Sequence, residues 1–189
     1  VAFFILVVMA RREPVIHTFT MAVGMLSWVL GNLLWISGFP IYQLVHWWIC
    51  YLILTIGGER LELSRVLRPA PQQIRAFGIL AGTILSLFNA NGGARLSGFA
   101  MLALSLWFLK NDLAARNIHH PIPLTRYIAY CLFAGFIWMG VGGALQLIYG
   151  ATYAGPLYDA ALHTVFVGFV MSMIFGHAPI IFPAILGAP

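Results

Sequence analysis

The chain of 189 residues is 61% hydrophobic and 8% charged, whereas soluble domains carry about 25% charged residues. These values exclude an ordinary soluble domain and indicate an integral membrane protein surrounded by a lipid bilayer. The formal net charge of +5 would suit a nucleic-acid partner, but the basic residues lie in short loops between apolar runs. We therefore interpret them as determinants of membrane topology and predict no nucleic-acid partner.

Apolar runs near the length that spans a bilayer predict an all-α fold, a polytopic transmembrane helical bundle. A transmembrane helix needs about 20 residues, and the alternating pattern of a membrane barrel is not found. The bundle is expected to form one domain over residues 1–189. Its predicted spans cover residues 15–37, 41–56, 74–90, 96–109, 127–148 and 160–177.

Three stretches leave the number of spans open. The runs 74–90 and 96–109 are short, so they form either two short spans or one re-entrant hairpin. The apolar pieces at 1–10 and 180–189 are too short to cross a bilayer. We interpret both pieces as truncated spans, and the chain as a fragment completed by the remainder of a longer multi-pass protein or by other membrane subunits.

Lysine and arginine are distributed asymmetrically along the chain. Nine of the ten lie in the loops 11–14, 57–75 and 110–126, and only Arg95 lies on the other side. By the positive-inside rule these three loops are cytoplasmic, and we expect a bacterial inner membrane. Within the second loop, Glu59 to Arg68 is interpreted as a solvated connector that pairs its own charges.

The run 160–177 carries two histidines, His163 and His177, fourteen residues apart in a segment without charge. On an uninterrupted α-helix this interval corresponds to about 21 Å along the axis and returns the two side chains to within about 40° of one face. Ionisable residues inside a membrane are costly and usually functional. The spacing therefore predicts a site near each surface of the bilayer.

Four histidines form two pairs by their predicted depth in the membrane, and the members of each pair come from different helices. His46 and His163 are predicted near the outer surface, and His17 and His177 near the inner surface. A haem iron accepts one imidazole from each side, so the four residues are predicted to ligate haem iron. The alternative is that they are interfacial histidines, or packing residues bonded to backbone carbonyls. The adjacent pair His119-His120 lies in a polar loop and is expected to face solvent.

The helix from His163 to His177, which begins with histidine and contains glycine and methionine, resembles the NnrS family of haem- and copper-containing membrane proteins. It resembles haem–copper oxidase subunit I more distantly. The resemblance implies haem b and copper, a redox partner, and a role in nitric oxide or respiratory metabolism. The sequence departs from the oxidase pattern because it has no adjacent histidine pair inside a span and no His-x-His helix.

The sequence thus supports two functional hypotheses. The first is an integral membrane haem- or metal-binding protein with an electron-transfer role, or a role in nitric oxide metabolism or respiration. The second is a cofactor-free membrane protein, either a transporter segment or a structural subunit packed through glycine-rich faces. Whether the protein is an enzyme stays open.

Overall fold

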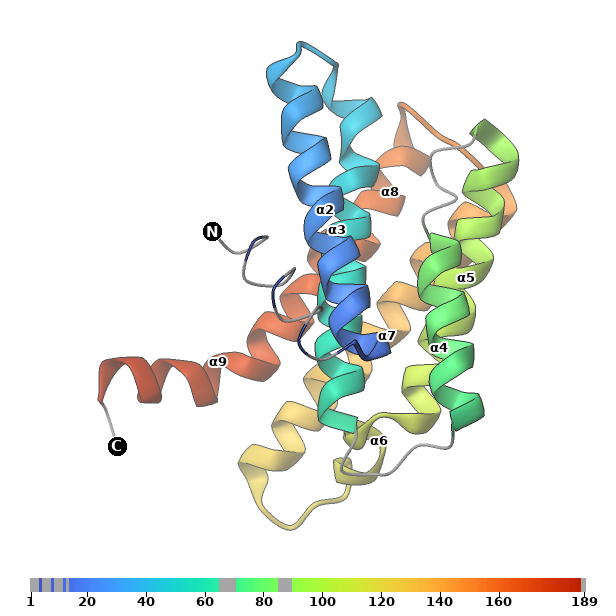
Figure 1. Cartoon of the computed structure of the whole chain (residues 1–189). Helices are drawn as coiled ribbons and strands as arrows, with labels where there is room; N and C mark the ends of the chain where they lie inside the picture. Colours follow the sequence, from blue (N-terminus) through green and yellow to red (C-terminus); the bar gives the residue numbers. More distant parts are fainter. Residues whose placement is uncertain are drawn as a thin grey trace.

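The computed structural model describes residues 4, 8, 12, 14–64, 71–84 and 90–187 (Figure 1). Every regular element in these ranges is a helix, which confirms the predicted all-α fold. Five of the described helices are long and apolar enough to cross a membrane. The protein is therefore an integral membrane protein with a transmembrane helical bundle.

The helices on either side of residues 37–40 form an antiparallel hairpin. Helix α2 (Ile16–Ile36) is joined to α3 (Ile41–Leu63) by a tight turn in which Gly38 adopts a positive φ of 88°. At Gly31 the two helices approach so closely that an added Cβ would lie 2.9 Å from Cβ of Trp47. Small residues permit this approach, as is common between membrane helices.

The middle of the chain contains α4 (Pro71–Ile84), α5 (Ala90–Asn111), the short α6 (Leu113–Asn117) and α7 (Pro123–Tyr149). With 22 residues α5 is long enough to span, whereas α4 has 14 described residues. For residues 74–109 the sequence left two alternatives open, two short spans or one re-entrant hairpin. The segment between the two runs includes residues 85–89, which lie outside the described residues. An aromatic cluster packs these helices together, with Phe108 of α5 stacked on Phe136 of α7 at 4.8 Å between ring centroids.

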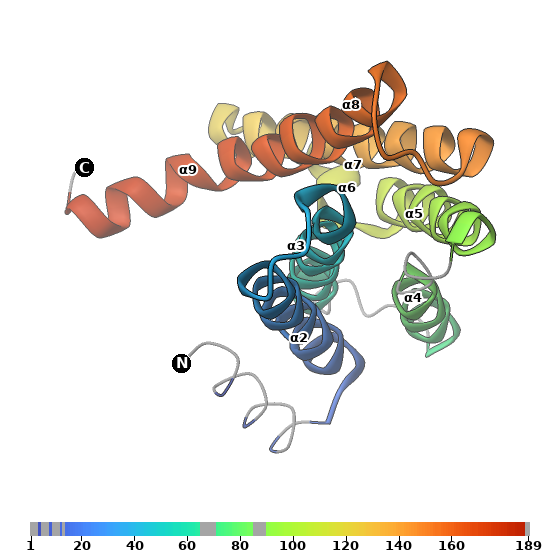
Figure 2. The same ribbon diagram turned by 90° about the horizontal axis from the view of Figure 1, so that it is seen from above.

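The last long helix has three parts, α8 (Pro156–His163), the π-helical segment η3 (Thr164–Val170) and α9 (Met171–Leu186). Both views show the end of α9 extending beyond the other helices (Figures 1 and 2). The prediction of a separate truncated span at 180–189 differs from the structure, since Ile180 to Leu186 continue α9. Pro179 and Pro183 lie inside this helix, and prolines bend membrane helices without necessarily ending them. Of the other truncated span, at 1–10, only Phe4 and Val8 are among the described residues.

The two ends of the bundle contain different connections (Figure 1). The α2–α3 turn, the beginning of α5 and the loop 150–155 lie at one end, and α6 lies at the other. Loop 110–126, predicted to be cytoplasmic, therefore lies opposite the turn at residues 38–40 predicted to be external.

A buried ion pair joins α3 to the beginning of α6, at the end of the bundle that contains α6. The Arg60 guanidinium donates from Nη2 and Nε to the two carboxylate oxygens of Asp112, at 2.7 and 3.0 Å. Asp112 also accepts a hydrogen bond of 2.8 Å from the backbone N–H of Ala114 and so caps α6. The prediction of a solvated connector is wrong at Arg60, because α3 continues through Gly57 and Gly58 and carries Arg60 into the protein.

Ser105 provides a polar link between two spans, since its hydroxyl donates to the backbone carbonyl of Phe136 at 2.6 Å. We expect Ser105→Ala to lower the free energy of unfolding by about 0.6 kcal/mol, the average for hydrogen bonds between membrane helices. Unfolding in mixed detergent micelles, followed by tryptophan fluorescence, measures this difference. Ser37→Ala, which removes an exposed hydroxyl at the end of α2, is the control; equal losses in both variants would contradict the expectation.

Candidate functional site

The π-helical segment changes the relation between His163 and His177. A π-turn holds about one residue more than an α-turn, so a single such turn shifts the following residues by roughly 100°. The angle about the helix axis between the two side chains, expected to be about 40°, therefore becomes roughly 140°. The two imidazoles point to different sides of the helix, which the prediction from an uninterrupted α-helix did not anticipate.

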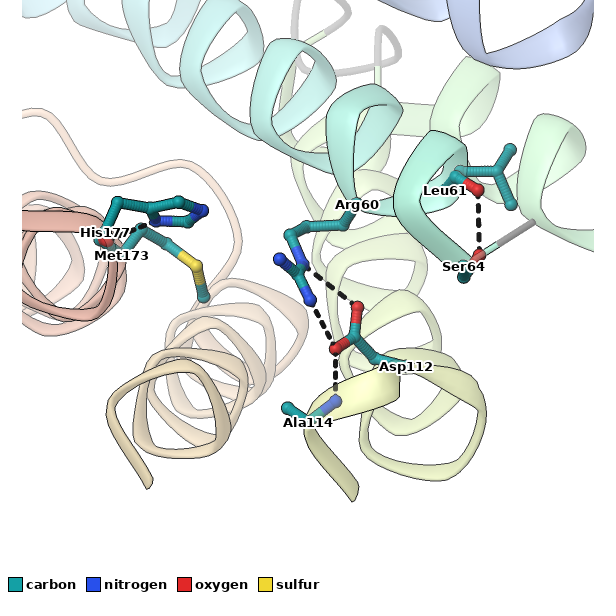
Figure 3. A network of polar contacts seen from close by, with 7 residues as sticks. All are labelled: Arg60, Leu61, Ser64, Asp112, Ala114, Met173 and His177. Atoms are coloured by element: carbon teal, nitrogen blue, oxygen red, sulfur yellow. Dashed lines mark hydrogen bonds and ion pairs between the residues drawn. The ribbon is translucent and has the colours of Figure 1, made fainter. Parts of the chain in front are cut away.

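His177 is held in one orientation by its own helix. Its Nδ1 lies 2.6 Å from the backbone carbonyl oxygen of Met173, one turn earlier (Figure 3). Because a carbonyl only accepts hydrogen bonds, Nδ1 carries the proton, and in the neutral ring Nε2 keeps its lone pair. Histidines that ligate metals typically have this arrangement, in which a bond from the second nitrogen fixes the tautomer and the ring.

The His177 side chain lines a groove of about 320 Å³ between α3 and the last helix. The volume lies at the lower end of the roughly 300–1,000 Å³ typical of ligand pockets. Only two of its lining side chains are ionisable, His177 and Glu59. The full lining comprises Ile56, Glu59, Val170, Met173, Ile174, His177, Ala178, Ile181 and Phe182. We call this the inner groove, after the cytoplasmic side predicted for His177 from the sequence.

His163 has the same local bond but different surroundings. Its Nδ1 lies 2.7 Å from the carbonyl oxygen of Asp159, so its Nε2 is also left with a lone pair. The side chain is exposed and lines none of the cavities described here. His163 therefore presents an oriented imidazole to the outside of the bundle.

His46 lies on the bundle side of α3, where it lines a small cavity at the end of the bundle predicted from the sequence to be external. The α8 residues that face this cavity include Tyr158, Ala161 and Leu162. On a regular helix His163 lies roughly 150° around from them. The cavity thus does not join the two imidazoles of the predicted outer pair. The aromatic neighbour of His46 is instead Tyr153, with ring centroids 6.5 Å apart.

His17 is buried in the first turn of α2, and its backbone carbonyl lies against Gly58 of α3. His177 faces α3 from the inner groove, through Ile56 and Glu59. On a helical projection Gly58 and the Ile56–Glu59 side of α3 are roughly 120° apart. The structure therefore places the backbone of His17 and the side chain of His177 against different faces of α3.

Among the residues that the structure describes, no group of three or more histidine, cysteine, aspartate or glutamate side chains is arranged to hold a metal ion. In the adjacent loop pair, His120 accepts a hydrogen bond of 3.2 Å from the backbone N–H of Ile122. His119 is exposed, as expected for a residue in a polar loop.

Sequence reasoning missed Glu59 as a member of the candidate site. It treated Gly57-Gly58 as the start of a loop, whereas the helix continues and Glu59 lies one turn after Ile56 on the same side. The signal that could have found Glu59 is its spacing of three residues from Ile56, because residues three apart lie on one face of a continuous helix.

These observations define the class of the protein, a polytopic α-helical membrane protein with oriented histidines on its last helix. The chain belongs to the family described as domain of unknown function DUF8744, which matches it over residues 1–189. Comparison with curated proteins and with solved structures found no significant match.

Proposed function

We propose that this protein binds haem b in the inner groove, with His177 as an axial ligand, and takes part in electron transfer in a membrane. The observation that carries the proposal is the 2.6 Å bond from His177 to the Met173 carbonyl inside a groove of about 320 Å³. The bond orients the ring and leaves Nε2 available.

The lining of the inner groove suits a large planar apolar group. Ile174, Ile181 and Phe182 would pack against its faces and edges, and the groove is open on one side, so part of the ring would contact lipid. Haem supplies a one-electron carrier whose potential depends on its axial ligand and its burial. The outer cavity of about 30 Å³ beside His46 is too small for such a group.

The other parts of the proposal rest on sequence. A role in nitric oxide metabolism or respiration, and a redox partner, are supported by the resemblance of the His163–His177 helix to the NnrS family. A bacterial inner membrane is supported by the asymmetry of lysine and arginine, with the inner groove then near the cytoplasmic surface. We retain His163 as a second imidazole for a ligand outside the bundle, and propose no copper centre within the described residues.

The competing hypothesis is a cofactor-free membrane subunit, and close glycine contacts between helices favour it. An added Cβ on Gly98 of α5 would lie 2.7 Å from the carbonyl oxygen of Gly143 on α7. Such contacts build a tightly packed bundle whether or not a cofactor is bound. The two hypotheses differ in one optical property, the Soret absorption of haem.

The test is the reduced-minus-oxidised absorption spectrum of protein purified from cells supplied with a haem precursor. We expect a Soret band in the wild type, loss of most of it in His177→Ala, and recovery when His177→Gly is given imidazole. His119→Ala, in the exposed loop, should leave the band unchanged. A wild-type protein without a Soret band would support the cofactor-free hypothesis, and a band that survives His177→Ala unaltered would overturn the assigned ligand.

A further inference from the structure

The outer end of the bundle contains a second site, separate from the inner groove. A largely enclosed cavity of about 30 Å³ lies between α3, α7 and the last helix, with Met101 of α5 on one side. It shares no lining residue with the inner groove. A cavity needs about 10–15 Å³ on this measure to hold one water molecule. The outer cavity therefore has room for one or two molecules of that size.

A residue that lines this cavity has a polar atom without a partner among the residues that the structure describes. Nδ1 of His46 is buried and makes no hydrogen bond to any of these residues. A buried polar group left unpaired costs about 1–3 kcal/mol, and most such groups in proteins are bonded to protein or to water. A small molecule that donates and accepts hydrogen bonds would satisfy Nδ1 in either tautomer of the ring.

The cavity lining offers further hydrogen-bonding groups. Gln146, Thr152 and Tyr158 line it together with His46. A buried water typically makes about three hydrogen bonds, so a site with several polar side chains is suited to hold one. The cavity thus differs from a purely apolar void, which would stay dry.

The loop at the outer end shapes the cavity wall. Gly150 adopts a positive φ of 73°, and the next N–H, of Ala151, donates to the side-chain oxygen of Asn91 at 2.9 Å. Both Gly150 and Ala151 line the cavity. This bond to α5 fixes the wall on the side nearest the outer surface, so the site is formed before any ligand arrives.

We propose that the outer cavity is a binding site for a small neutral hydrogen-bonding molecule of about one to three heavy atoms, held by Nδ1 of His46. Water occupies it in the resting protein. The proposal uses none of the inner-groove residues and stands apart from haem binding.

Water contact with His46 can be measured directly by solid-state NMR on protein labelled with ¹⁵N-histidine in lipid bilayers. Magnetisation transferred from water protons should reach Nδ1 of His46 within a mixing time at which buried histidines in dry surroundings show no signal. His46→Gln assigns the resonance. Absence of this transfer in the wild-type protein would by itself overturn the proposal.

A cavity-filling variant locates the molecule. Ala161→Leu extends a lining side chain of α8 into the cavity and should abolish the transfer to Nδ1. Ala154→Leu, an exposed residue of the same loop region that does not line the cavity, should preserve it. Transfer that persists in folded Ala161→Leu protein would show that water reaches His46 by another route, and the assigned site would be wrong.

Discussion

Asp112→Ala is expected to lower the free energy of unfolding by about 3–5 kcal/mol, the cost of breaking a buried ion pair from one side. The side chains of Arg60 and Asp112 are 6% and 1% exposed, so the remaining guanidinium would stay buried without its carboxylate. The substitution also removes the cap of α6, which contributes about 1 kcal/mol in comparable helices. Because the pair joins α3 to the α6 connector, we expect the loss to appear in the global unfolding transition.

Unfolding in mixed detergent micelles measures this loss, with Arg116→Ala as the matched control. Arg116 lies on the same short helix α6 but is exposed, so its removal should change stability by less than about 0.5 kcal/mol. The double replacement Arg60→Met with Asp112→Asn should recover part of the loss, since no buried full charge remains. A loss below about 1 kcal/mol in Asp112→Ala would show that water or lipid headgroups reach Arg60 readily.

Gly98→Ala is expected to destabilise the bundle by about 1–3 kcal/mol through overpacking between α5 and α7. An added Cβ at Gly98 would lie 2.5 Å from the backbone nitrogen of Leu147, and one at Gly143 would lie 2.6 Å from the backbone nitrogen of Leu102. Backbone atoms cannot move aside as a flexible side chain can, so the helices must separate. Gly143→Ala should have a similar effect, and the double variant should lose less than the sum because both act on one contact.

The control for this prediction lies on the same helix. Gly92→Ala adds a Cβ that meets no atom within 4 Å, so only the helix propensity of alanine operates and stability should be equal or higher. Thermal unfolding in one detergent, at matched protein concentration, compares the three single variants. If Gly98→Ala and Gly92→Ala behave alike, the close approach of α5 and α7 is not a determinant of stability.

The main features of the fold were predictable because they depend on local composition. A run of about 20 apolar residues must form a helix in lipid, where every backbone polar group needs an internal partner. The all-α class and most of the spans followed from this requirement alone. The end of α3 was harder to predict from the sequence, since Gly57-Gly58 resembles the end of a helix. A helix continues past two glycines only if other elements pack around it, as they do around α3.

The candidate site was only partly predictable. Depth along a helix can be counted from sequence, so the choice of His163 and His177 as residues near opposite surfaces needed no structure. Their direction around the helix could not be counted, because the π-helical segment at Thr164–Val170 adds about one residue to a turn. At the beginning of that segment an added Cβ on Gly142 of α7 would lie 2.6 Å from Oγ1 of Thr164, so α7 packs tightly against it.

Hydropathy and charge along the chain are therefore sufficient to establish a polytopic α-helical membrane protein, and they predict the depths of its histidines and the sidedness of its loops. Contacts between helices alone decide that Arg60 is buried against Asp112 and that Glu59 joins His177 in the inner groove. They also place the backbone of His17 against a different face of α3 from His177. The physical reason is that partition into a membrane is a property of each segment, whereas the direction of a side chain depends on the helices packed around it.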